Sequence, residues 1–111
     1  MTAETFHIGP DLVTDWAEIA GDFNPLHVDA EYAAATRFGG PIVHGSLLLA
    51  LVADRVQDLH GARLIDGGEL AFEFRAPVLV GSTVTLEPQG DSFGIRVGEG
   101  FPIETTVALR S

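Results

Sequence analysis

An aspartate and a histidine lie close together in an otherwise apolar segment that a proline interrupts. Asp22 and His27 flank Asn24-Pro25, and a turn of this length can bring both side chains to one side of the loop. A carboxylate and an imidazole that share one water molecule can act together as acid and base. The same spacing also fits a simpler arrangement, in which Asp22 caps a helix or turn and His27 packs against the core.

A second candidate segment leads into a strongly apolar stretch. Gly39-Gly40-Pro41 is followed by Ile42-Val43 and then by His44-Gly45-Ser46. The first N–H groups of a helix have no internal partners and lie at the positive end of the helix dipole. Because glycine lets a ligand approach the backbone closely, this helix start could hold a carbonyl oxygen, such as that of a thioester, as it gains negative charge. In the simpler alternative, Ser46 is an N-cap and Gly45 only saves space.

The first half of the sequence predicts three helices that carry these two segments. Apolar residues at helical spacing follow Pro10, and Gly21 and the Asn24-Pro25 pair end that helix. Asp29 can cap a second, short helix that runs through the alanines at 33–35. The third helix, from about 45 to 59, is apolar on every side near its start, which predicts a helix buried all round.

The second half of the sequence predicts strands. After a first short strand at 5–8, apolar residues alternate or cluster at 69–75, 83–87, 93–97 and 103–109, and turn-forming residues separate these runs. Helices followed by a meander of strands indicate an α+β domain in which an antiparallel sheet wraps a buried central helix. We expect one domain, residues 1–111, since no linker or repeat is visible.

Composition excludes several kinds of chemistry. The chain has no cysteine, which excludes disulfides and thiolate chemistry, and its six basic residues are all arginine, which excludes a lysine Schiff base. A net charge of −10 argues against nucleic acid as a partner. No signal peptide and no apolar run long enough for a bilayer are visible, so we expect a cytoplasmic protein without membrane contact. No histidine and carboxylate spacing indicates a metal site, and no cofactor is expected.

Several segments together carry a resemblance to a known family. The order AGDFNPLHVD, RFGGPIVHG, a leucine-rich helix and FEFRAPVLVGSTV, over about residues 11–87, resembles the MaoC-like dehydratases. That family includes the (R)-specific enoyl-CoA hydratases. The resemblance implies a hot-dog fold, a homodimer, and hydration of a trans-2-enoyl thioester of coenzyme A or acyl carrier protein to the (R)-3-hydroxyacyl product, or the reverse dehydration.

The resemblance also assigns roles to residues of this sequence. It implies that Asp22 and His27 are catalytic and that the N–H of Gly45 forms the oxyanion hole. Four further residues are expected to support the site: Asn24, Pro25, His44 and Ser46.

Two other functions fit the same sequence. One is a hot-dog acyl-thioesterase, in which water attacks the carbonyl carbon, and the other is a non-catalytic binding subunit of a heterodimeric dehydratase. The Asp22–His27 segment favours the hydratase over both.

Overall fold

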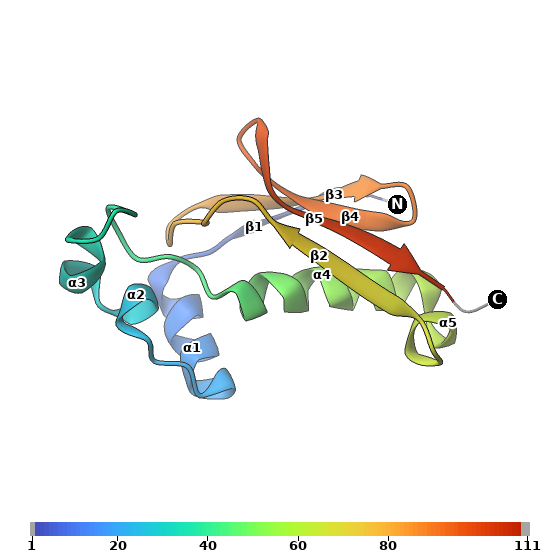
Figure 1. The fold of residues 1–111 in the computed structure, drawn as a ribbon, viewed down its shortest axis with the longest axis horizontal. Helices are drawn as coiled ribbons and strands as arrows, with labels where there is room; N and C mark the ends of the chain where they lie inside the picture. The colour runs from blue at the N-terminus through green and yellow to red at the C-terminus, as the bar shows by residue number, and fades with distance from the viewer. Residues whose placement is uncertain (1, 110–111) are drawn as a thin grey trace.

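The computed structural model describes residues 2–109, in which one short strand and five helices precede the other four strands (Figure 1). The helices are α1 (Pro10–Ala20), α2 (Pro25–Val28), α3 (Ala30–Ala34), α4 (Gly45–His60) and α5 (Ala62–Ile65). The strands are β1 (Glu4–His7), β2 (Glu69–Phe74), β3 (Thr83–Gln89), β4 (Ser92–Val97) and β5 (Gly100–Ala108). The predicted α+β class is confirmed, and each predicted helix and strand has a counterpart.

The five strands form one antiparallel sheet in the order β1-β3-β4-β5-β2. Strands β3, β4 and β5 are the predicted meander, but β2 pairs with β5 along its whole length, from Glu69 opposite Ala108 to Phe74 opposite Ile103. The simple meander is therefore wrong for β2. Strand β2 therefore forms one edge of the sheet, and β1, which pairs with β3, forms the other.

The sheet curves over α4, which is the central helix (Figure 1). Leu47, Leu48, Val52 and Val56 of this helix are buried in the core. Their partners are buried residues of three strands, Val84, Leu86, Ile95 and Ile103 among them. In the single chain α4 is buried on this face only, whereas Leu49, Ala50 and Ala53 are half-buried, so the prediction of a helix buried all round is wrong.

The ends of the first helices follow from single residues. Pro10 is the first residue of α1, where its missing N–H costs nothing, and Gly21 ends α1 in the left-handed conformation with φ of 68°. The Asn24-Pro25 pair was expected to form only a tight turn, but Pro25 begins the short helix α2. Proline disfavours the helical conformation for the residue before it and suits the first helical position itself.

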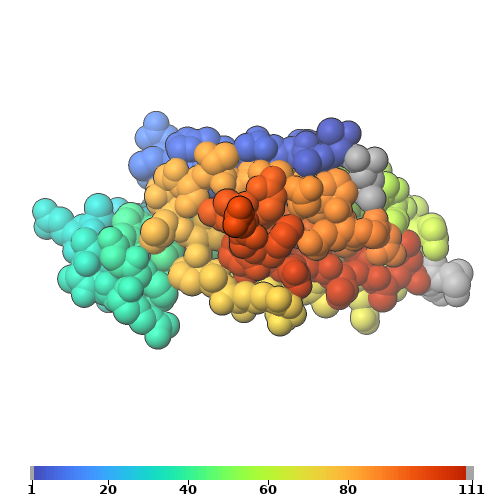
Figure 2. Space-filling view, turned by 90° about the horizontal axis from the view of Figure 1, so that it is seen from above, coloured from blue at the N-terminus to red at the C-terminus, as the bar shows by residue number. Residues whose placement is uncertain are grey.

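Helices α1 to α3 lie at one end of the molecule. Figure 2 shows α2 and α3 projecting beyond the sheet, and the molecule measures 49 × 31 × 20 Å. Between residues 2 and 109, no helix is both long and apolar enough to span a membrane.

Candidate active site

Asp22 and His27 face each other across a gap that is slightly too wide for a direct hydrogen bond. Nε2 of His27, in α2, lies 3.8 Å from Oδ2 of Asp22, in the loop after α1. Nδ1 of His27 is 2.7 Å from the carbonyl oxygen of Ile42, which can only accept, so Nδ1 carries the proton. In the neutral ring the lone pair is therefore on Nε2, the nitrogen that faces the carboxylate.

The loop itself orients the Asp22 carboxylate. The Asn24 N–H donates to Oδ1 of Asp22 at 3.3 Å, and the Asn24 side chain accepts from the Leu26 N–H at 3.0 Å. One carboxylate oxygen is thus held by the turn and the other faces His27. The Asp22 side chain is 47% exposed and that of His27 is 13% exposed, so the pair lies at an opening rather than inside the core.

His44 packs behind this pair. Its side chain is 1% exposed, and its ring stacks on that of His27 with 3.9 Å between ring centroids and 26° between ring planes. Nε2 of His44 donates to the backbone carbonyl of Asp22 at 2.9 Å. Nδ1 of His44 is buried and has no hydrogen-bond partner within residues 2–109.

The start of α4 lies beside His27. His44 is the N-cap residue, and Gly45 and Ser46 are the first two residues of the helix. Among the described residues, no hydrogen bond uses the Gly45 N–H. The alternative in which Ser46 is the N-cap is wrong, because its hydroxyl lies within the helix and accepts from Nε1 of Trp16 at 2.9 Å. This bond ties α1 to α4.

A cavity of about 340 Å³ opens next to His27 and Gly45. Asp22 does not line it. Such a cavity can hold an apolar chain with a polar group beside His27 and Gly45. The remaining lining residues are mostly apolar: Ile42, Val43, Leu48, Phe74, Arg75, Ala76, Pro77, Val78 and Ile103.

Phe74 lies directly against Gly45. A methyl group built on Gly45 would be 3.3 Å from Cε1 of Phe74, a tighter approach than most side chains make. Gly45 thus serves both to expose the helix start and to leave room for this ring. Phe74 is nevertheless 54% exposed, because β2 is an edge strand.

Arg75 is a cation at the rim of this cavity, and its guanidinium forms ion pairs with two carboxylates. It pairs with Glu73 at 3.1 Å and with Glu104 at 2.8 Å. The hydrogen bond that Arg75 donates to Glu73, followed by the charges of Glu104 and Glu73, raises the pKa of Arg75. The rim therefore carries more negative than positive charge.

Asp22, His27 and His44 also meet the simplest distance requirement for a metal site. One potential ligand atom from each lies within 4.8 Å of the others. However, Nδ1 of His27 and Nε2 of His44 already donate to backbone carbonyls, and the free nitrogen of His44 is fully buried. A metal would have to break one of these bonds or reach a buried atom, so this donor set does not fit one.

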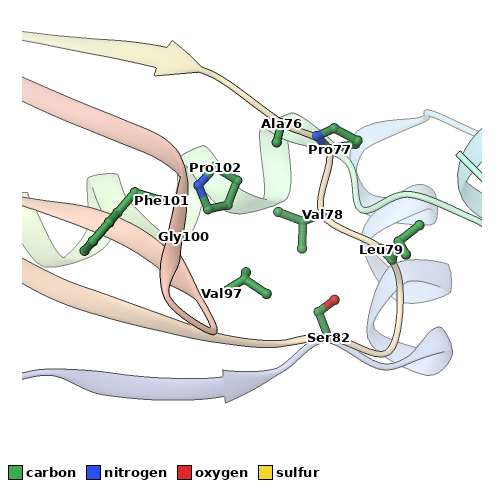
Figure 3. A pocket seen from close by; sticks show the side chains of 9 residues that line it. All are labelled: Ala76, Pro77, Val78, Leu79, Ser82, Val97, Gly100, Phe101 and Pro102. Atoms are coloured by element: carbon green, nitrogen blue, oxygen red, sulfur yellow. The ribbon is translucent and has the colours of Figure 1, made fainter.

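A second cavity, of about 330 Å³, lies between the segment Ala76–Leu79 and the β4–β5 hairpin. Val78, Val97 and Pro102 gather around it in Figure 3. It shares the wall Ala76-Pro77-Val78 with the cavity beside His27. Its one polar lining side chain is that of Ser82, so this cavity can hold an apolar group but offers no acid–base pair.

Sequence reasoning did not single out three residues that shape the site. Ile42 contributes a backbone carbonyl, which leaves no trace in residue type. Trp16 was interpreted as part of a helix face, although its indole N–H reaches Ser46. Phe74 could have been found from the alternation Leu70-Phe72-Phe74, since it is the last inward position before the strand ends.

Comparison with known proteins identifies the family. The model of the MaoC like domain matches residues 2–105. The chain belongs to the MaoC-like domain family. Residues 22, 27 and 45 all lie inside the matched range.

Named relatives of this MaoC-like chain act on acyl thioesters. It is 45% identical over 80 residues to an (R)-specific enoyl-CoA hydratase of Aeromonas caviae, an alignment that covers 71% of this chain and 59% of that protein. It is 41% identical over 81 residues to 3-hydroxyacyl-thioester dehydratase Z of Mycobacterium tuberculosis, covering 69% of this chain and 54% of the relative. The chain thus spans between half and three fifths of the length of these two relatives.

A solved structure shows the same fold. The (R)-hydratase from A. caviae involved in PHA biosynthesis superimposes with a TM-score of 0.72 at 30% identity, covering 96% of this chain and 90% of that one. The predicted hot-dog fold is confirmed by this likeness, by the antiparallel sheet and by its central helix.

Proposed function

We propose that this MaoC-like chain, acting as one domain over residues 1–111, adds water to trans-2-enoyl thioesters to give (R)-3-hydroxyacyl thioesters, or catalyses the reverse dehydration. Asp22 and His27 are the catalytic pair and the Gly45 N–H is the oxyanion-hole donor. The (R) product is taken from the names of the relatives.

The observation that carries the proposal is the gap between Nε2 of His27 and Oδ2 of Asp22. A water molecule about 2.8 Å from each acceptor fits across a separation of 3.8 Å and can donate one O–H to each. Both acceptors are available, since Nδ1 of His27 is protonated toward Ile42 and Oδ1 of Asp22 is held by Asn24. The lone pairs of that water then point away from the pair and are available for attack on a substrate.

The chemistry follows from this placement. The water oxygen forms a bond to C3 of the enoyl group while one of its protons passes to the Asp22–His27 pair. The electron pair of the double bond moves to C2 and the carbonyl oxygen, and C2 then takes a proton from the pair. Because the oxygen and the proton come from one side of the substrate, the addition is syn.

The start of α4 can stabilise the negative charge that develops on the carbonyl oxygen of the thioester. The Gly45 N–H lines the same cavity as His27 and has no acceptor among the described residues. A helix N-terminus favours negative charge, and a donor already in place gains most when the charge develops in the transition state. The apolar walls of the cavity would then hold the acyl chain.

Coenzyme A or an acyl carrier protein would carry the acyl group. Among the five described arginines, Arg55, Arg75 and Arg96 pair with carboxylates of this chain and Arg37 lies over the ring of Phe38, so few are available for the phosphates of a carrier. The neutral pantetheine arm, common to both carriers, would therefore contribute most of the docking. We also propose that the enzyme is cytoplasmic, a location that a cysteine-free sequence fits.

We also propose a homodimer in which the β2 strands of two copies lie edge to edge. Within residues 2–109, β2 pairs on one side only, and an open edge of this kind needs cover. Phe74 on this strand is 54% exposed, and Leu49, Ala50 and Ala53 leave one face of α4 half-buried. A second copy could cover both. Light scattering that shows a stable, active monomer at micromolar concentration would contradict this arrangement.

The experiment that tests the function is an assay with crotonyl-CoA that follows two signals. Hydration removes the absorbance of the conjugated enoyl thioester without releasing thiol, and chiral analysis should find the (R)-3-hydroxy product. Release of free coenzyme A with the double bond intact would instead identify an acyl-thioesterase. Binding without either change, restored to turnover by a second and different subunit, would identify the binding subunit of a heterodimer.

A further inference from the structure

One buried ring contacts every part of the proposed site. His44 donates from Nε2 to the carbonyl of Asp22 at 2.9 Å, and its ring stacks on His27 with centroids 3.9 Å apart. Its backbone is the N-cap of α4, immediately before Gly45. The loop of Asp22, the ring of His27 and the start of α4 are therefore joined through this one residue.

The other nitrogen of His44 makes the residue a poor choice for stability alone. Nδ1 is buried and has no hydrogen-bond partner in the described part of the chain. A buried acceptor without a donor destabilises the folded state, whereas an apolar side chain of similar size would not. The presence of a histidine at this position calls for a reason other than packing.

His44 is also out of reach of a substrate. Its side chain is 1% exposed, and it does not line the cavity that His27 and Gly45 share. A direct role in proton transfer to the substrate is thereby excluded for this geometry. Any contribution of its side chain to the reaction therefore has to pass through Asp22 and His27.

We infer that His44 is a positioning residue that keeps the gap between Asp22 and His27 at the width of one water molecule. The inference rests on the proposed function of that pair. Two contacts would fix the His27 ring, the stack on His44 and the bond from Nδ1 to Ile42. The bond from His44 to the Asp22 carbonyl would fix the other side of the gap, although the Asp22 side chain itself is half-exposed.

Three variants separate the two contacts of His44. His44→Phe keeps an aromatic ring against His27 but has no donor for Asp22, and His44→Gln keeps an N–H donor but no ring. His44→Leu loses both contacts and also removes the unpaired nitrogen. Because misplacement of reacting groups by about 1 Å can cost about 10²-fold in rate, we expect kcat to fall about 10-fold for Phe and Gln and about 10²-fold for Leu. KM should stay within about threefold of the wild type in each case, since His44 does not touch the cavity.

A purely structural role would give a different pattern. If His44 only filled the core, kcat would follow the folded fraction. The inference instead predicts that His44→Leu lowers kcat far more than the loss of folded protein measured by its Tm can explain. In solution, NMR of the His27 ring should show an upfield shift from the stacked ring in the wild type and in His44→Phe, and its loss in His44→Gln.

A matched control is available in this chain. His60 also donates from Nε2 to a backbone carbonyl, that of Asp91 at 2.6 Å, but outside the site. His60→Leu should leave kcat unchanged.

The outcomes distinguish this inference from the proposed function. If Asp22→Asn and His27→Ala are inactive but all folded His44 variants keep kcat within about threefold, the positioning role is overturned and the function stands. If kcat falls only in proportion to a lower Tm, or if the His27 ring resonances are the same in all variants, the role is likewise overturned. If the wild type leaves every enoyl thioester unchanged, the proposed function fails, and the inference fails with it before any variant is compared.

Discussion

The imidazole of His44 lies face to face with that of His27, with 3.9 Å between the ring centroids and 26° between the ring planes. The two residues belong to different elements, since His27 is in α2 and His44 caps α4. The site is thus assembled where a short helical turn meets the start of the central helix. Each contact across this junction gives a prediction that can be measured.

Removal of either member of the pair should stop catalysis without unfolding the protein. Asp22→Asn keeps the shape of the carboxylate but cannot accept a proton, and His27→Ala removes the second acceptor. Each should lower kcat by about 10²–10⁴-fold in enoyl-thioester hydration. The double variant should be little slower than either single one, because both act on the same water. Near wild-type turnover by both single variants, in samples that circular dichroism shows to be folded, would refute the assignment.

Gly45→Val should weaken the oxyanion hole. A β-carbon at this position would already approach Phe74 to 3.3 Å, and the branched side chain would push the acyl group away from the helix start. We expect kcat/KM to fall about 10²–10³-fold, the scale for the loss of one such donor. Measurement of kcat at saturating substrate separates this loss from a blocked cavity, which would raise KM.

The double variant Gly45→Val, Phe74→Leu is the control for crowding. If it recovers full activity, the single variant failed because of steric pressure on Phe74 and not because of the N–H. An unchanged kcat in Gly45→Val together with an inactive Ser46→Ala would show that the serine hydroxyl binds the carbonyl.

The bond between Trp16 and Ser46 should contribute to stability and not to catalysis. Nε1 of Trp16 donates to the Ser46 hydroxyl at 2.9 Å and joins α1 to α4. Ser46→Ala should lower the free energy of unfolding by about 1 kcal/mol, as for a typical hydrogen bond, with kcat unchanged. A double-mutant cycle with Trp16→Phe, followed by urea unfolding, measures the coupling. No coupling between the two substitutions would mean that the bond is absent in solution.

Glu104→Gln should improve the binding of charged substrates. Glu104 contacts Arg75 at the cavity rim at 2.8 Å, and its replacement removes a negative charge and releases part of the guanidinium. At low ionic strength we expect KM for crotonyl-CoA to fall about twofold, and salt should cancel the gain. The crotonyl thioester of N-acetylcysteamine, which carries no phosphate, is the control, and an equal change in its KM would show that charge is not the cause.

Local sequence signals predicted the ends of helices well wherever a single residue type determines the backbone conformation. Pro10, Gly21 and Asp29 mark the ends of helices because each favours one backbone conformation or one cap bond. Helix α2 was not predicted, because Pro25 was interpreted only as a signal that ends the preceding helix. A proline can also be the first residue of a new helix. The order of the strands was not predicted either, because the pairing of β2 with β5 joins segments that are far apart in the sequence.

By itself the sequence determined which residues are candidates for chemistry. Asp22, His27 and Gly45 stand out through residue type and spacing, and a chain without cysteine or lysine excludes nucleophilic catalysis by a thiolate or a lysine amine. Spacing along a loop does not give the distance across it, however. Only the tertiary structure decided the gap of 3.8 Å, because the Ile42 carbonyl binds the His27 ring and the buried ring of His44 contacts both His27 and the Asp22 carbonyl. These come from segments 15 and 17 residues after His27, and packing of α4 beneath the sheet, not local preference, brings them to the loop.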